Sequence, residues 1–261
     1  MYNFEFEKPS SVEDAVAALA ADDAQALGGG QTLIPTLKQR LASPSKLVSL
    51  SGIAEMLGVR SEGSALVIGG GMTHADVAAQ AAAYPALAEM AAHIGDPAVR
   101  NRGTIGGSLA NNDPSADYPA AALASAAVIV TNAREIAADD YFQGMFDTAL
   151  DEGEIITRVK FAVPQAANYQ KFVQPASRFA LVGVFVAKHA DGVRVAVTGA
   201  SEQGVFRWGE AEAALNKEFR IDALMGLKIN PMNMIGDLHG TKEYRAHLVG
   251  VMTKRAVAAA V

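Results

Sequence analysis

Cysteine is absent from this chain of 261 residues. Without thiols the chain forms no disulfide, and it supplies no thiolate ligand for zinc or for an iron–sulfur cluster. If the protein handles electrons, we expect its own cofactor to be organic and any iron–sulfur cluster to belong to a partner. The five histidines lie far apart in the sequence without metal-ligand spacing, so we expect no metal site.

The chain also lacks an excess of basic residues and a long apolar run. It has 22 Lys and Arg against 28 Asp and Glu, a formal net charge of −6, which argues against nucleic acid as a partner. The alanine-rich stretch 78–83 is too short to span a membrane. Residues 1–8 alternate apolar and charged side chains like a strand and do not resemble a signal peptide. We therefore expect a cytoplasmic protein without a membrane span.

Glycine is plentiful, and its placement is informative. Gly106 and Gly107 follow the run Arg100-Asn101-Arg102-Gly103-Thr104-Ile105 and precede Ser108. Two missing side chains allow the backbone to approach a ligand closely and to adopt positive φ. Successive backbone N–H groups bind anions, and Arg100 and Arg102 add positive charge. The stretch predicts half of a nucleotide-phosphate site.

The other half is expected near residue 30. Gly28–Gly30 lie between a predicted strand at 24–27 and a predicted helix at 33–41, where anions are favoured. The stretch is not a P-loop, and Leu33 stands where a dinucleotide fingerprint would have its third glycine. Together, the two glycine segments are suited to hold two phosphates of a dinucleotide through backbone N–H groups. A second triple glycine at 69–71 is interpreted as a reused turn.

Asp113 and Asp117 follow the central stretch. One interpretation is an acid–base pair of the two carboxylates, but Asp113-Pro114 is typical of a turn. Asp117 is interpreted either as a cap for a helix near Pro119 or as an acceptor for sugar hydroxyls. Arg100 and Arg102 either face the ligand or fix the loop from behind.

Four segments carry a family resemblance: Gly28–Pro35, Ile94–Ser108, Asp113–Asp117 and Ser177–Val182, and the likeness extends to the tail at Asp237–Arg245. Together they resemble the medium, FAD-binding subunit of the molybdenum hydroxylases, a family that includes aerobic carbon monoxide dehydrogenase and xanthine dehydrogenase-like enzymes.

The resemblance implies an FAD site on this chain and no catalytic residue. The backbone of Gly28–Pro35 would hold the pyrophosphate, Thr104–Ser108 would form the second loop, and Asp117 would bind the sugar chain. Ile156 and Lys171 match further family positions. Gln31 replaces a histidine common in relatives. The implied cofactor-binding residues are Gly28, Gly29, Gly30, Gln31, Thr32, Leu33, Ile34, Pro35, Thr104, Ile105, Gly106, Gly107, Ser108, Asp117, Ile156 and Lys171.

The resemblance also implies an α+β fold. A vanillyl-alcohol-oxidase (PCMH)-type FAD domain would cover residues 1–165, with lobes at about 1–52 and 53–165. A C-terminal domain, 166–261, would contain an antiparallel sheet. The strand-like segments 169–173, 180–189 and 193–199, with a hairpin turn at 190–192, independently predict such a sheet.

The implied function is electron transfer. A small subunit with [2Fe–2S] clusters would deliver electrons to FAD, and a large subunit with a molybdenum–pterin cofactor would oxidise the substrate, in a dimer of heterotrimers. The sequence leaves two alternatives open: a stand-alone FAD oxidoreductase, and a nucleotide-binding assembly subunit without redox activity.

Overall fold

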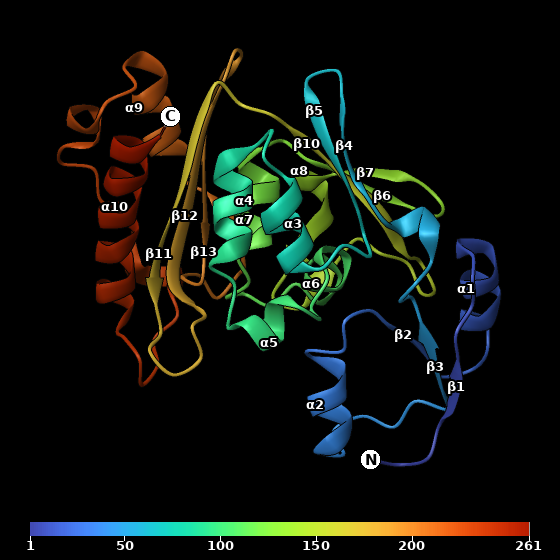
Figure 1. The fold of residues 1–261 in the computed structure, drawn as a ribbon. Helices are drawn as coiled ribbons and strands as arrows, with labels where there is room; N and C mark the ends of the chain where they lie inside the picture. The colour runs from blue at the N-terminus through green and yellow to red at the C-terminus, as the bar shows by residue number, and fades with distance from the viewer. Residues whose placement is uncertain (261) are drawn as a thin grey trace.

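The computed structural model describes residues 1–260, and Val261, the last residue of the expected C-terminal domain, lies outside them. The chain is a mixture of helices and four separate sheets (Figure 1). From the N-terminus to the C-terminus, three successive parts contain a small parallel sheet, a five-stranded antiparallel sheet with helices, and a four-stranded antiparallel sheet with helices.

The first part is a three-stranded parallel sheet in the order β1-β3-β2. Its first helix begins where Ser11 accepts a hydrogen bond from the N–H of Asp14 at 3.1 Å, as expected for an N-cap. The second helix ends three residues before the predicted position 41, because Arg40 adopts a left-handed φ of 60°. The elements are β1 (Glu5–Glu7), α1 (Val12–Leu19), β2 (Ala24–Leu27), α2 (Leu33–Lys38) and β3 (Lys46–Ser49).

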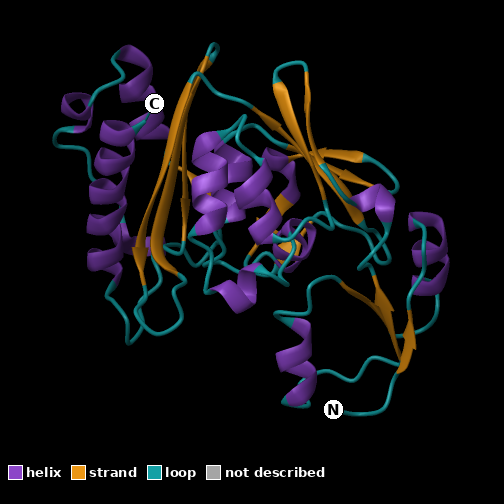
Figure 2. Cartoon of the chain, in the orientation of Figure 1, coloured by secondary structure: helices purple, strands orange, loops and turns teal. Residues whose placement is uncertain are grey.

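The second part is an antiparallel sheet in the order β4-β5-β10-β6-β7, with helices packed against one side (Figure 2). The central double glycine, expected in a loop, lies in the first turn of a helix, α6. The elements are η1 (Ala54–Met56), β4 (Val59–Glu62), β5 (Ala65–Gly69), α3 (His74–Gln80), α4 (Pro85–Ala92), α5 (Pro97–Arg100), α6 (Ile105–Asn111), α7 (Tyr118–Ala124), β6 (Val128–Thr131), β7 (Glu135–Ala137), α8 (Ala138–Tyr141), β8 (Phe142–Gly144), β9 (Asp147–Thr148) and β10 (Ile156–Ala162).

The third part is an antiparallel sheet in the order β11-β12-β13-β14, and the strand-like segments of the sequence predicted its first three strands. The long last helix begins at the N-cap Thr241 and covers one face of this sheet (Figure 1). The elements are β11 (Ala166–Val173), β12 (Ala180–His189), β13 (Gly192–Thr198), β14 (Phe206–Arg207), α9 (Gly209–Lys217), η2 (Ile221–Leu224), η3 (Pro231–Asn233) and α10 (Lys242–Ala259).

Both faces of the third sheet are buried. Successive side chains of a strand point to opposite faces, so Val184 and Val186 of β12 pack in the cluster under α9 and α10. Phe185 and Ala187 point the other way, into the main core formed by the second part. The main hydrophobic core therefore crosses the expected domain boundary at residue 165.

Candidate functional site

The two glycine segments predicted to form one site lie side by side. Gly28–Thr32 connects β2 to α2, and residues 101–104 connect α5 to α6. A Cβ built on Gly29 would overlap the carbonyl oxygen of Arg102, and one on Gly28 would lie 3.0 Å from Thr104 Oγ1. Only glycine permits this approach at residue 29, so the close contact itself explains the residue type.

The first segment carries unused hydrogen-bond donors. Gly30 adopts a left-handed φ of 74°, and its carbonyl accepts the N–H of Ile34 at 3.1 Å. Within residues 1–260, the five successive N–H groups of 29–33 donate to no protein acceptor. Backbone donors are normally paired unless water or a ligand accepts from them. The segment thus offers a row of N–H groups to an anion.

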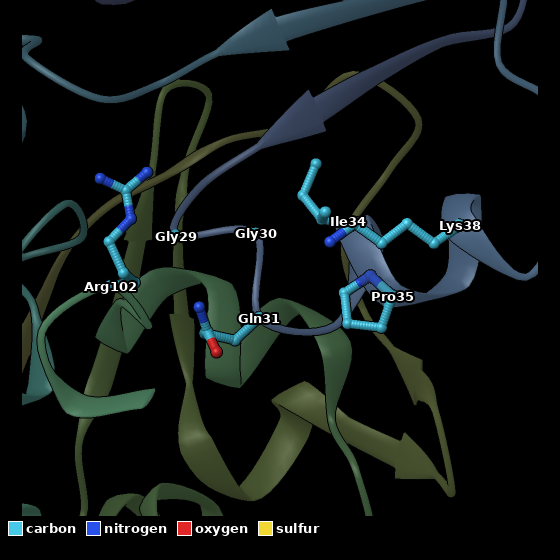
Figure 3. Close-up of a pocket in the computed structure, with 7 residues that line it drawn as sticks. All are labelled: Gly29, Gly30, Gln31, Ile34, Pro35, Lys38 and Arg102. Atoms are coloured by element: carbon cyan, nitrogen blue, oxygen red, sulfur yellow. The ribbon is translucent and has the colours of Figure 1, made fainter. Parts of the chain in front are cut away.

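A pocket of about 370 Å³ opens at this segment. Figure 3 shows Arg102 and Lys38 on opposite sides of it, with Gly29 and Gly30 between them. Among the described residues, neither cation forms an ion pair or a side-chain hydrogen bond within the protein. The lining residues are Gly29, Gly30, Gln31, Ile34, Pro35, Lys38 and Arg102.

The second glycine segment differs from the prediction. Gly106 and Gly107 have no positive φ and form the first turn of α6, where Thr104 Oγ1 accepts the N–H of Gly107 at 3.1 Å. The N–H groups of 105, 106 and 108 donate to carbonyls of Met72, Gly70 and Thr104. The N–H groups of 105–108, expected to be free for a ligand, therefore all donate hydrogen bonds within the protein. Their acceptors belong to the first turn of α6 and to the neighbouring turn at 70–72.

Gly106 faces protein rather than an open site. A Cβ on Gly106 would lie 2.6 Å from the carbonyl oxygen of Gly70, whereas Gly107 is exposed. Gly70 in turn packs against the carbonyl of Ile156, which a Cβ would overlap. The N–H groups of Gly69–Gly71 all donate to protein carbonyls. The second triple glycine is thus a close-packed turn behind α6, in agreement with its interpretation as a reused turn, and Ile156 is buried behind it.

Asp117 is buried and pairs with the third sheet. Its carboxylate accepts a hydrogen bond from the Tyr169 hydroxyl and lies 3.1 Å from Lys171 Nζ, whose side chain is also buried. Asp117 occupies the N-cap position of α7 but makes no cap hydrogen bond, so the capping alternative is wrong. Burial raises the pKa of Asp117, while Lys171 and Tyr169 stabilise its anion and oppose that rise.

Asp113 lies in a turn, as its Pro114 neighbour suggested. Its Oδ1 accepts the N–H of Ser115 at 2.8 Å. The carbonyls of Pro114 and Ala116 accept hydrogen bonds from the Thr198 hydroxyl of β13. The structure records no direct hydrogen bond between the two aspartates, and each one has its own protein partners. An acid–base pair of Asp113 and Asp117 has no support in these contacts.

A second pocket, of about 500 Å³, lies beside Lys171. Arg100 lines it and donates from Nη1 to the carbonyls of Ile94 and Gly95 at 3.0 and 3.1 Å. The two arginines therefore differ: Arg100 fixes the preceding loop, and Arg102 faces the first pocket. Glu89, His93, Tyr169 and Arg178 are among the other lining residues.

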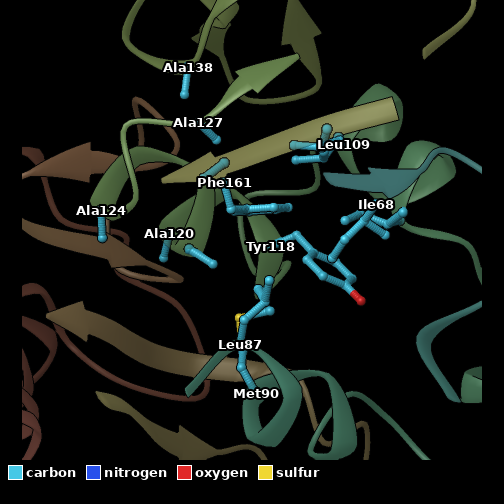
Figure 4. Packing of buried hydrophobic residues seen from close by; sticks show 14 of the residues in the cluster. Ile68, Leu87, Met90, Leu109, Tyr118, Ala120, Ala124, Ala127, Ala138 and Phe161 are labelled. Atoms are coloured by element: carbon cyan, nitrogen blue, oxygen red, sulfur yellow. The ribbon is translucent and has the colours of Figure 1, made fainter. Parts of the chain in front are cut away.

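His74, which no sequence motif marked, supports the Arg100–Thr104 segment from behind. Its N–H donates to the carbonyl of Gly103 at 2.9 Å, and its ring packs 5.4 Å from that of Tyr118 between centroids. Figure 4 shows Tyr118 among Ile68, Leu87 and Phe161. Burial, and then the nearby Arg100, lower the pKa of His74 to about 4, so the ring is neutral at pH 7.

Lys38, Tyr169 and His74 are the site residues that sequence reasoning missed. The only available signal for Lys38 was its position one helical turn after Ile34, on the same face of α2. The remaining expected residues are not among those that line the first pocket, and Ile105 and Gly106 are buried. Thr32 precedes α2 and is exposed, Leu33 is half-buried, and Ser108 is half-buried on α6.

Within the chain as described, no group of three or more histidines or acids is placed to hold a metal. None of the helices within residues 1–260 combines the length and hydropathy needed to cross a membrane.

The geometry fits a dinucleotide phosphate group. Within residues 1–260, the N–H groups of 29–33 have no protein acceptor, and Gly29, Gly30 and Gln31 of this run line the pocket together with Lys38 and Arg102, which form no ion pair. Such a set stabilises an anion through charge-assisted hydrogen bonds.

Comparison with known proteins identifies the family of this chain. Residues 2–165 match the family of the FAD binding domain in molybdopterin dehydrogenase. The chain is 35% identical to the carbon monoxide dehydrogenase medium chain of Hydrogenophaga pseudoflava, covering 98% of this chain and 96% of that protein. It is 33% identical to the nicotine 6-hydroxylase medium subunit of Paenarthrobacter nicotinovorans, covering 97% and 95%.

The fold is also that of a solved relative. The reconstituted CO dehydrogenase from Oligotropha carboxidovorans contains a chain that superimposes with a TM-score of 0.88 at 31% identity, covering 98% of this chain and 96% of that one. With the family match over most of the chain, the α+β fold with a PCMH-type FAD domain is shown. The chain therefore belongs to the FAD-binding medium subunits of the molybdenum hydroxylases and is an oxidoreductase subunit.

Proposed function

We propose that this chain holds FAD between partner [2Fe–2S] clusters and an external electron acceptor. The observation that carries the proposal is the row of five free N–H groups at 29–33 beside Lys38 and Arg102, within the part that matches the FAD domain. FAD, when bound, takes up electrons singly and passes them on in pairs. The residues of this chain bind and orient it.

Gly28–Pro35 would hold the FAD pyrophosphate. Their N–H groups are the donors, and the glycines keep the backbone accessible. Thr104–Ser108 would form the adjoining wall, with the exposed Gly107 and two hydroxyls rather than free N–H groups. Gln31 lines the same pocket and can hydrogen-bond in place of the histidine of relatives.

Asp117 and Lys171 would serve the sugar chain of FAD as a pair. Lys171 lines the second pocket, and its ammonium holds the buried Asp117 carboxylate at 3.1 Å. The remaining acceptor capacity of that carboxylate suits sugar hydroxyls. Ile156 is buried behind Gly70, and its carbonyl packs against Gly70, which in turn packs against Gly106 of α6. Ile156 would therefore help to position α6.

The iron–sulfur and molybdenum chemistry would lie on other chains. This chain has no cysteine to ligate a cluster. A solved relative from Hydrogenophaga pseudoflava is described as a carbon monoxide dehydrogenase lacking the Mo-pyranopterin moiety of its cofactor. We infer a small iron–sulfur subunit and a large molybdenum subunit as partners, in a cytoplasmic dimer of heterotrimers.

We also propose a division into two domains, which the family match over residues 2–165 supports. The FAD domain would cover 1–165, with lobes at 1–52 and 53–165 that contribute the two sides of the first pocket. Residues 166–261 would form the C-terminal domain, which supplies Lys171 and Tyr169 to Asp117.

An absorption spectrum tests the proposal. After reconstitution with FAD and removal of free flavin, we expect the full chain to retain one FAD per chain, with flavin bands in the blue. Failure of the folded chain to retain flavin would contradict the proposal.

A further inference from the structure

Lys38 and Arg102 reach the first pocket from two different segments. Lys38 is the last residue of α2, and Arg102 lies between α5 and α6, on the other side of the glycine segment (Figure 3). Both residues are exposed. Across residues 1–260 these two cations form no ion pair, although both line the same pocket.

The backbone at Arg102 is fixed, whereas α2 is weakly anchored. Gly29 packs directly on the Arg102 carbonyl, and the N–H of Arg102 donates to the carbonyl of Val99 at 3.2 Å. By contrast, α2 has six residues, of which only Leu37 is buried. Little apolar burial therefore determines where α2 sits, and two like charges across the pocket disfavour its approach.

We propose that Lys38 and Arg102 form a two-sided clamp that closes α2 on the pyrophosphate of the cofactor. The inference rests on the proposed function and adds two residues that the family resemblance did not assign. Each cation would contact phosphate oxygens of the pyrophosphate, which carries two negative charges. The repulsion between Lys38 and Arg102 would then be replaced by the attraction of each cation to the pyrophosphate. Cofactor phosphates would then position α2 as well as bind to it.

The test is FAD binding by the full-length apoprotein, followed by flavin fluorescence at several salt concentrations. For Lys38→Met and Arg102→Met we expect the Kd for FAD to rise about 10- to 100-fold, the range for a lost charge-assisted contact. We also expect a weaker dependence of Kd on salt, because fewer charges remain to be screened. Lys38→Arg and Arg102→Lys should retain most of the affinity.

Lys217→Met on α9 and Arg255→Met on α10 are matched controls. Each removes one positive charge from an exposed position that lines neither pocket, and the FAD affinity should match that of wild type. A second measurement is hydrogen exchange of α2. FAD should slow exchange at residues 33–38 in wild type and much less in the two Met variants.

The outcomes separate the clamp from the proposed function. If wild type binds FAD and both Met variants bind it with the same Kd, the clamp is wrong and the FAD function stands. A raised Kd with unchanged salt dependence and unchanged α2 protection would indicate general damage to the fold and would also overturn the clamp. If folded wild type binds no FAD, the proposed function fails, and the clamp fails with it.

Discussion

Gly29 packs against the backbone of Arg102 and Gly103 in the other segment of the site. Its Cα faces the carbonyl oxygen of Arg102 so closely that a Cβ would overlap it. The clash is with backbone, which cannot rotate away as a side chain can. The identity of residue 29 thus determines whether the two segments of the pocket meet.

We expect Gly29→Ala to destabilise the protein by about 1–3 kcal/mol, the usual cost of overpacking, and to lose FAD because the pocket walls separate. Urea unfolding and flavin retention measure the two effects. Gly250→Ala is the control: its site in α10 is open, and alanine there should stabilise the helix by up to about 1 kcal/mol. Retention of FAD by Gly29→Ala at wild-type affinity would contradict the placement of the site.

His74 makes stability depend on pH. Its pKa is about 4 in the folded protein, chiefly because of burial, against 6.5 for an unperturbed histidine. Between these values the unfolded chain binds a proton that the folded chain excludes, so stability falls as pH decreases from about 6.5 to about 4. Above pH 6.5 this penalty is absent.

Comparison of the unfolding free energy of wild type and His74→Gln across this range isolates the effect. The variant should show a flatter dependence on pH, whereas His247→Gln, at an exposed position of α10, should follow wild type. Parallel curves for wild type and His74→Gln would show that the buried ring does not titrate in this way.

Helix α6 is the element that differs most from its sequence-based prediction. The sequence predicted a ligand-facing glycine loop, because double glycines are typical of such loops and their hydrogen bonds cannot be read from sequence. Instead Thr104 caps α6, and Gly106 allows the close approach of Gly70. The first three strands of the third sheet, in contrast, were predictable, since strand-like segments joined by a hairpin turn are local signals, whereas β14 was not predicted.

The cap at Thr104 supports a prediction at the scale of the element. Thr104→Ala should cost about 1 kcal/mol of stability through the lost cap and should also weaken FAD binding, because the side chain lies against Gly28. Thr241→Ala removes the equivalent cap of α10 and should cost similar stability with unchanged FAD affinity. Equal FAD affinity in both variants would remove α6 from the site.

The whole molecule is joined across the expected domain boundary. Phe185 and Ala187 enter the core of the second part, and Lys171 reaches Asp117 from β11. The sequence indicated a separate C-terminal unit because successive strand-like segments begin near residue 169. It did not reveal that both faces of that sheet are buried, since contacts distant in sequence leave no local pattern. The proximity of segments 28–35 and 100–108 could likewise be inferred only by combining two glycine-rich segments, each of which is a weak signal alone.

Flavin reduction within the complex tests the central claim most directly. The FAD-loaded chain is mixed anaerobically with the partner iron–sulfur and molybdenum subunits and their substrate, and the flavin absorbance in the blue is followed. We predict that it bleaches only when the iron–sulfur subunit is present. Equal bleaching by substrate with this chain alone, or no bleaching in the complete complex, would contradict the account of this chain as the FAD-carrying electron-transfer subunit.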